Sequence, residues 1–142
     1  MNIVSMLVIY NDKGEILLQD RANIKTVWED YSFFGGHLEQ WETPDETLQR
    51  EIKEELDIEL NTWDYEFLGI WNKNVYKTGK NYDIYFYLYR ADQDVFTDRE
   101  GSGASFWEIS QAKRNKFVAP FEDILDFLEI KIKDVLRSAG KK

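Results

Sequence analysis

The sequence has no cysteine, which excludes disulfides, thiolate zinc sites and cysteine nucleophiles. Histidine is nearly absent too, because His37 is the only one, so we do not expect a histidine-rich site for a transition metal. Oxygen ligands remain, and these suit Mg²⁺, Mn²⁺ or Ca²⁺.

Positive charge is scarce as well. There are 18 lysines and arginines against 27 aspartates and glutamates, which gives a net charge of -9. This balance predicts neither a nucleic-acid partner nor an anionic membrane partner. A small anionic ligand remains compatible, since a bound metal ion can reverse the local charge.

Long hydrophobic runs are also lacking, and none approaches the length needed to span a membrane. The apolar residues 3–10 follow no basic stretch and enter a polar turn at 11–14, which predicts a strand and not a secretion signal. We therefore expect a cytoplasmic protein. The 142 residues, 43% of them hydrophobic, suit a single domain over 1–142 with one core.

The pattern of apolar residues and turn signals predicts an alternation of strands and helices. The first half has two strands, a polar loop, an aromatic run ending in Gly35-Gly36, and a helix. Two strands around a turn at 78–81, a loop, a short strand and a long amphipathic helix make up the second half. The predicted strands cover residues 1–10, 15–20, 63–75, 82–90 and 104–108, and the last helix starts at Phe121. This order predicts an α/β fold with a mixed sheet covered on both faces.

The helix after Thr43 has the clearest local signals. Thr43 is a good N-cap, proline suits the first helical position, and Glu46 completes a capping box. Apolar residues then recur every fourth position, at Leu48, Ile52 and Leu56. This spacing predicts a buried stripe along one face of the helix.

Three glutamates of this helix, Glu51, Glu54 and Glu55, are spaced by three and four, so they share one side of it. Like charges this close repel unless a cation lies between them. A hard divalent cation fits, and such an ion is typical of phosphate chemistry. On spacing alone, the alternative is a solvated acidic face. Arg50 lies beside Glu54 and can pair, four residues away, with either Glu46 or Glu54.

At this point the chain resembles the Nudix hydrolases, whose motif is G-x5-E-x7-R-E-U-x-E-E-x-G-U, with U a bulky aliphatic residue. The motif covers residues 36–58, and one position departs from it: Asp57 stands where the family has glycine. That residue is expected to take a left-handed C-cap conformation, which aspartate tolerates at a cost of about 1 kcal/mol or less. The matching positions are Gly36, Glu42, Arg50, Glu51, Ile52, Glu54, Glu55 and Ile58.

The resemblance implies an α/β/α sandwich around a mixed sheet, and it implies roles for particular residues. Mg²⁺ or Mn²⁺ would be bound by the three helical glutamates and by a backbone carbonyl of Gly35 or Gly36. One further carboxylate would come from the loop before a late strand, where Glu100 fits best and Asp98 is the substitute. Arg50 would orient the carboxylates, and Glu42 would anchor the loop or bind the ion through water. The catalytic set is then Glu51, Glu54, Glu100 and Arg50, and the metal set is Gly36, Glu51, Glu54, Glu55 and Glu100.

The implied reaction is hydrolysis of a nucleoside diphosphate linked to a group X, with Glu54 or Glu100 as the general base. Substrate contacts are expected from Gly35, Gly36, His37, Glu42 and Trp28. The stretch from Trp28 to Gly36 looks like the branch that converts (deoxy)nucleoside triphosphates, oxidised dGTP included, to monophosphate and pyrophosphate.

Nucleotide sugars and ADP-ribose stay open as substrates. Two alternatives of another class also stay open: a module that senses a nucleotide without turnover, and a structural Ca²⁺ site. We expect a monomer or a homodimer with a small nucleotide as its ligand.

Overall fold

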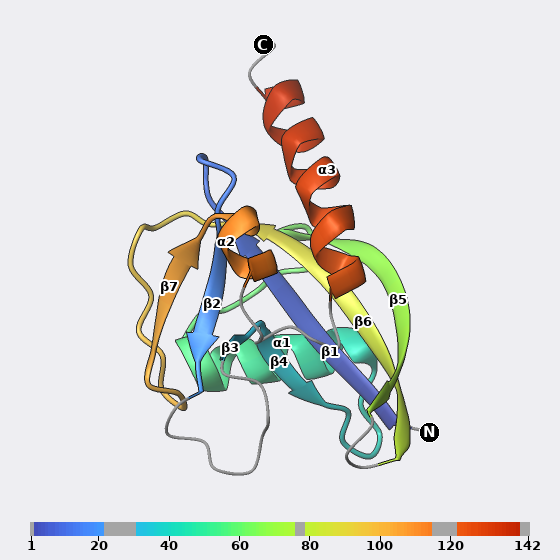
Figure 1. The fold of residues 1–142 in the computed structure, drawn as a ribbon. Helices are drawn as coiled ribbons and strands as arrows, with labels where there is room; N and C mark the ends of the chain where they lie inside the picture. The colour runs from blue at the N-terminus through green and yellow to red at the C-terminus, as the bar shows by residue number, and fades with distance from the viewer. Residues whose placement is uncertain (1, 22–30, 76–78, 115–121, 140–142) are drawn as a thin grey trace.

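The computed structural model describes residues 2–21, 31–75, 79–114 and 122–139 and is shown in Figure 1. Trp28 and Phe121, both named in the sequence-based predictions, lie outside these ranges. The strands are β1 (Asn2–Tyr10), β2 (Ile16–Asp20), β3 (Tyr31–Ser32), β4 (Phe34–His37), β5 (Tyr65–Val75), β6 (Lys80–Arg90) and β7 (Gly103–Trp107). The helices are α1 (Pro44–Leu56), α2 (Ile109–Arg114) and α3 (Glu122–Ala139).

The strands form one mixed sheet with β1 near its centre. β1 pairs in parallel with β6, from Asn2 opposite Tyr82 to Tyr10 opposite Arg90, and antiparallel with β2 and β4. The main path is β3-β2-β1-β6-β5, while β4 pairs with β1 and β7 pairs with β2. The predicted mixed sheet is therefore confirmed.

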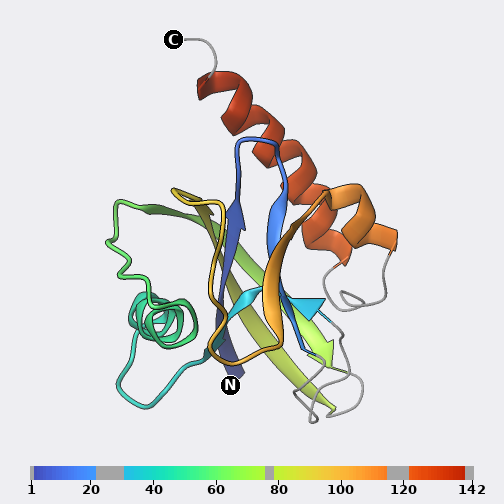
Figure 2. The ribbon, with the colours of Figure 1, turned by 90° about the vertical axis from the view of Figure 1, so that its left-hand side faces the viewer.

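Helices cover both faces of this sheet, with α1 on one side and α2 and α3 on the other (Figure 2). Each face has its own buried apolar cluster. The α1 side packs the helical stripe of Leu48, Ile52 and Leu56 against the sheet, and the other side packs Ile124, Leu128 and their neighbours on α3. The α/β/α sandwich implied by the resemblance is confirmed. None of the described helices has the length and apolar character that crossing a membrane requires.

Two local predictions need correction. The chain forms a short helix, α2, that was not predicted, because its six residues bury only Ile109 and Ala112 and give no helical period to detect. At Gly35-Gly36 the sequence predicts either a sharp bend or a close approach to a ligand; there is no sharp bend, because both glycines lie within strand β4 and pair with β1. The other elements agree with the predictions to within a few residues at their ends.

Candidate active site

The start of α1 is fixed as predicted. Thr43 is the N-cap, its side chain accepts from the backbone N–H of Glu46, and the Glu46 carboxylate accepts from the backbone N–H of Thr43. Ser5 of β1 donates its hydroxyl hydrogen to the carbonyl of Pro44 at 2.8 Å, which ties the helix start to the sheet. These contacts set where the later turns of α1 lie relative to the strands.

The helix ends at Asp57, which has φ 57° and ψ 40°, so the left-handed C-cap expected there is confirmed. The backbone N–H of Asp57 donates to the carbonyl of Lys53 at 3.0 Å. The ammonium of Lys53 lies 2.9 Å from the Asp57 carboxylate, which lowers the pKa of that carboxyl. Aspartate therefore replaces glycine here without changing the end of the helix.

Arg50 is the centre of the polar network on α1. Its guanidinium forms a two-pronged contact with Glu42, with Nε donating at 2.6 Å and Nη2 at 3.0 Å. Nη1 donates to Glu51 at 2.9 Å and lies 3.5 Å from Glu54, while Nη2 also donates to the carbonyl of His37 at 3.2 Å. The hydrogen bonds from Arg50 lower the pKa of Glu42 to about 2. Arg50 thus joins the loop before the helix, the end of β4 and two glutamates of α1.

Sequence spacing had allowed Arg50 to pair with Glu46 or Glu54. The Glu54 contact is present but long, and Glu46 is engaged at the N-cap. The main partner is Glu42, which also accepts from the Thr47 hydroxyl at 2.8 Å. The predicted role of Glu42 as an anchor between loop and helix agrees with this arrangement.

The two glycines of β4 allow close approach on both sides of the strand. At Gly35, φ is +152° and a Cβ would collide with the backbone carbonyl oxygen of Ser5. At Gly36, a Cβ would collide with the carboxyl group of Glu51. Side chains at these positions would push β4 away from β1 and from the acidic face of α1.

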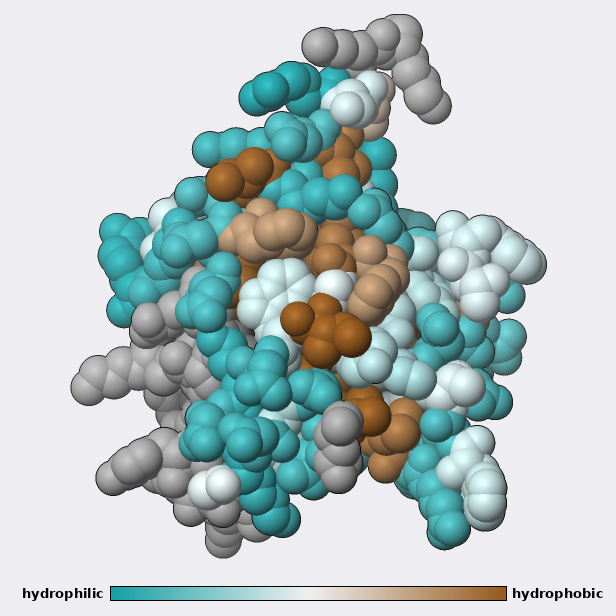
Figure 3. Space-filling view, turned by 90° about the vertical axis from the view of Figure 1, so that its right-hand side faces the viewer, coloured by the Kyte–Doolittle hydropathy of each residue, from teal (hydrophilic) through white to brown (hydrophobic). Residues whose placement is uncertain are grey.

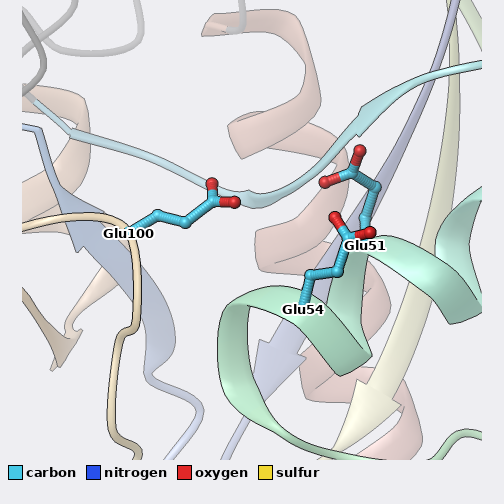
Figure 4. A group of neighbouring side chains, drawn as sticks. All are labelled: Glu51, Glu54 and Glu100. Atoms are coloured by element: carbon cyan, nitrogen blue, oxygen red, sulfur yellow. The ribbon is translucent and has the colours of Figure 1, made fainter.

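Three carboxylates converge beside β4. Glu51 and Glu54 reach out from α1, and Glu100 reaches toward them from the loop before β7 (Figure 4). One oxygen from each of the three lies within 4.8 Å of the other two. Burial and the charges of Glu51 and Glu54 raise the pKa of Glu100, and burial raises that of Glu51.

Glu55 lies beneath this cluster and is only 3% exposed. Burial and the nearby charges of Glu100 and Glu51 raise its pKa to about 9, although the backbone N–H of Gly35 donates to it. A hydrogen bond joins the Glu55 and Glu51 carboxyl groups. In the absence of a metal ion, burial and these neighbouring charges therefore favour the protonated form of Glu55 at neutral pH.

The loop that carries Glu100 is organised by Asp98. Its carboxylate accepts from the backbone N–H groups of Glu100 and Gly101, both at 3.0 Å, and from the Gln19 amide on β2 at 3.1 Å. A Cβ at Gly101 would collide with Asp98 and with the Asp20 carbonyl. Glu100 is therefore the carboxylate that joins the cluster, while Asp98 shapes the loop.

Arg21, at the end of β2, was not singled out from the sequence. Its guanidinium donates to Gln19 and to the Ser32 hydroxyl, both at 3.1 Å, and its charge partly offsets the rise in the pKa of Glu100 that burial and the neighbouring glutamates cause. Its Nε is buried and has no hydrogen-bond partner among the described residues. The sequence gives no local sign of this role, because the partners of Arg21 come from two different strands, Gln19 from β2 and Ser32 from β3.

Of the remaining predicted substrate contacts, His37 ends β4 and is exposed, with its ring centroid 5.8 Å from that of Tyr82. Trp41, in the turn before α1, is 93% exposed. The site thus comprises the carboxylate cluster, the Arg50 network above it, and an aromatic pair at the end of β4.

The donor set fits a hard divalent cation. The three converging groups are all carboxylates, their oxygens lie close enough to share one ion, and the backbone of Gly36 lies beside Glu51. Mg²⁺ and Mn²⁺ prefer such oxygen ligands. A bound cation would also relieve the repulsion that raises the pKa of Glu51 and Glu100.

Comparison with known proteins agrees with this geometry. The family model described as the NUDIX domain matches residues 2–136. Among curated proteins, an uncharacterized Nudix hydrolase of Nostoc sp. is 30% identical over 108 residues, which are 74% of this chain and 62% of that protein. The match thus spans less than two thirds of that relative.

Solved structures with the same fold include the E. coli ORF135 protein, with a TM-score of 0.71 at 22% identity over 99% of this chain and 94% of that one. A MutT structure from work on Aliivibrio salmonicida and Vibrio cholerae has a TM-score of 0.70 at 19% identity, covering 92% and 98%. The E. coli dihydroneopterin triphosphate pyrophosphohydrolase has a TM-score of 0.72 at 14% identity, covering 91% and 95%. At these identities the likeness is one of fold.

Proposed function

The chain belongs to the Nudix hydrolase family, and on that premise we propose that it hydrolyses a nucleoside diphosphate linked to X with Mg²⁺ or Mn²⁺ bound at the carboxylate cluster. The observation that carries this proposal is the convergence of Glu51, Glu54 and Glu100 within 4.8 Å. Two of these groups come from α1 and one from a distant loop. A solvated acidic helix face would not require Glu100 to turn toward it.

The chain's own residues would bind and orient the reactants. Glu51, Glu54, Glu55 and Glu100 would hold the ions, with Glu55 losing its proton when a cation binds. Arg50 fixes Glu51 through its 2.9 Å hydrogen bond and fixes the preceding loop through Glu42. When bound, the ions supply neutralisation of the phosphate charge and a more acidic water. A carboxylate, Glu54 or Glu100, would accept the proton of the attacking water.

For the substrate, we infer a (deoxy)nucleoside triphosphate that is cleaved to the monophosphate and pyrophosphate. His37 is exposed and its ring lies 5.8 Å from that of the half-buried Tyr82, so this pair offers a surface on which a base can stack. One of the fold neighbours is named as a triphosphate pyrophosphohydrolase, so this architecture accommodates substrates of that class. The positive charge of Arg21, which acts on Glu100, suits a substrate with several phosphates.

The deciding experiment is a substrate panel with product identification by mass spectrometry. It would contain the nucleoside triphosphates, oxidised dGTP, nucleotide sugars and ADP-ribose, each with Mg²⁺, Mn²⁺, Ca²⁺ or a chelator. We expect Mg²⁺-dependent release of pyrophosphate and a nucleoside monophosphate. Turnover of ADP-ribose or a nucleotide sugar alone would establish the alternative substrate class instead. Absence of turnover throughout, with nucleotide still bound, would establish a sensing module.

A matched pair of variants ties the activity to this cluster. Glu51→Gln removes a carboxylate that converges with Glu54 and Glu100, while Glu59→Gln removes one whose side chain is 84% exposed just after α1. We expect activity to be lost in the first and retained in the second. Equal activity of the two variants would show that the carboxylate cluster does not take part in the reaction.

A further inference from the structure

β5 is the end strand of the sheet, and within the described residues it pairs only with β6. It is long, with 11 residues from Tyr65 to Val75, and its outer edge lies at the right of Figure 1. An open edge presents backbone N–H and C=O groups to any further strand that approaches.

Apolar side chains gather along this edge. Phe67 and Ile70 of β5 are each 51% exposed, and Ile130 of α3 is 66% exposed. Phe127 of α3 continues the surface, and its ring packs 5.4 Å from that of Trp71 on β5. Figure 3 faces this side and shows apolar surface over the middle of the face and up toward α3. A contiguous exposed surface of this kind is typical of an interaction site.

A bulge determines which side chains of β5 share a face. Phe67 is opposite Tyr87 and Gly69 is opposite Phe86, so Leu68 is the extra residue. Phe67 lies on the α1 side, where its ring contacts those of Tyr85 and Tyr87. Ile70, opposite Tyr85, lies on that side too. The bulge therefore keeps Phe67 and Ile70 on one face although they are three residues apart.

Charged residues flank Ile70 symmetrically. With Leu68 and Gly69 counted as one position of the ladder, Ile70 is midway between Glu66 and Lys73. Both of these lie on the α3 side, where Glu66 pairs with Lys131 at 2.7 Å and Lys73 pairs with Asp123 at 2.6 Å. A twofold axis through Ile70 would place opposite charges across from each other.

We propose that β5 pairs antiparallel with β5 of a second copy of this chain, about a twofold axis at Ile70. Ile70 then faces Ile70 of the second copy, and Glu66 faces the second copy's Lys73 on the same side of the sheet. The two ion pairs on the α3 side join into a row of alternating charge that fixes the register. Such self-complementarity is what a symmetric interface requires, and the two sheets become one.

The test uses the twofold axis itself. Ile70→Lys and Ile70→Glu each place like charges face to face across the axis, so each variant alone should be monomeric in sedimentation equilibrium. An equimolar mixture should form a heterodimer, because lysine then faces glutamate. The wild type should be a dimer. Trp63→Lys is the matched control, since Trp63 is 81% exposed but precedes the strand, and it should remain dimeric.

Circular dichroism and thermal melts confirm that each variant is folded. Hydrogen exchange supplies an independent readout, because the amides of β5 should become more protected as the wild-type concentration rises. A monomeric wild type would overturn the proposal. So would a mixture of the two charged variants that stays monomeric, or an Ile130→Lys variant that dissociates a dimer which Ile70→Lys leaves intact.

Discussion

Gly36 on β4 lies so close to Glu51 on α1 that a Cβ at position 36 would collide with the glutamate carboxyl group. The glycine therefore sets the position of a predicted metal ligand without itself offering a side chain. Its neighbour Gly35 differs, because a Cβ there would meet the backbone of Ser5. Gly36 thus makes room for the Glu51 side chain, whereas Gly35 makes room for the backbone of β1.

This difference gives a paired prediction. Gly36→Ala displaces only the end of a flexible side chain, so we expect stability within about 1 kcal/mol of wild type and a rate lower by about 10²-fold. Gly35→Ala clashes with backbone at a strained φ and should destabilise the fold by about 3 kcal/mol. Urea denaturation and steady-state kinetics on both variants check this. Equal loss of stability would show that Glu51 cannot move aside.

The second prediction separates the two candidates for the general base. We expect Glu54→Gln to keep the fold and to lower kcat by about 10²–10⁴-fold. Glu100→Gln should lower kcat less and should instead raise the Mg²⁺ concentration needed for half-maximal rate. If the two variants exchange these behaviours, Glu100 is the base.

Asp98 provides the third prediction, because it holds the Glu100 loop without joining the cluster. Asp98→Ala removes the acceptor of the Glu100 and Gly101 backbone N–H groups and of the Gln19 amide. We expect a higher Mg²⁺ requirement together with a lower Tm, since the amide of the buried Gln19 loses its acceptor. Asp94→Ala, in the same loop but exposed, is the control and should leave the metal requirement unchanged. A normal Mg²⁺ titration for Asp98→Ala would show that the loop needs no such support.

Features that depend on a few neighbouring residues were predictable from the sequence. The capping box at Thr43, the left-handed C-cap at Asp57 and the common side of Glu51 and Glu54 all follow from helix geometry. Each needs only information from within a turn or two of the helix. These features placed the acidic face of α1 correctly.

Features that depend on contacts between distant segments were not predictable from local rules. Arg50 pairs chiefly with Glu42 in the preceding loop, where helical spacing had indicated residues four positions away. Asp98 is held by Gln19, which is 79 residues away in sequence. The bulge at Leu68 likewise follows from pairing with β6 and leaves no mark on the alternation of apolar residues. Only the family resemblance pointed to Glu100.

The fourth prediction concerns Glu55 and pH. Its pKa is raised to about 9 in the folded protein, chiefly by burial, whereas a glutamate in the unfolded chain has its ordinary pKa of about 4.5. Between these values the folded state holds a proton that the unfolded state has lost. The free energy of unfolding without metal should therefore fall as pH rises through this range. Thermal melts in chelator across that range measure the slope.

Glu55→Gln should flatten this slope, because a neutral amide replaces the protonated carboxyl group. Mg²⁺ should restore stability most at high pH, and its binding near neutral pH should release protons, seen by calorimetry in buffers of different ionisation enthalpy. A metal-free stability that rises toward pH 9, or Mg²⁺ binding without proton release, would show that Glu55 is already ionised.

The last prediction concerns Trp41, which has φ +70° and a side chain that is 93% exposed. A left-handed backbone disfavours a non-glycine residue by about 1–2 kcal/mol. Glycine relieves that strain, at an entropic cost of about 0.5–1 kcal/mol in the unfolded chain. Since the exposed ring contributes no packing, Trp41→Gly should stabilise the protein by roughly 0.5–1 kcal/mol.

Trp63→Gly is the matched control, because Trp63 is 81% exposed but has no positive φ, so glycine there should only destabilise. Urea denaturation should therefore show a higher free energy of unfolding for Trp41→Gly than for the wild type, and a lower one for Trp63→Gly. Were Trp41→Gly less stable than the wild type, the turn between β4 and α1 would depend on a contact made by the indole, and its exposure would need another explanation.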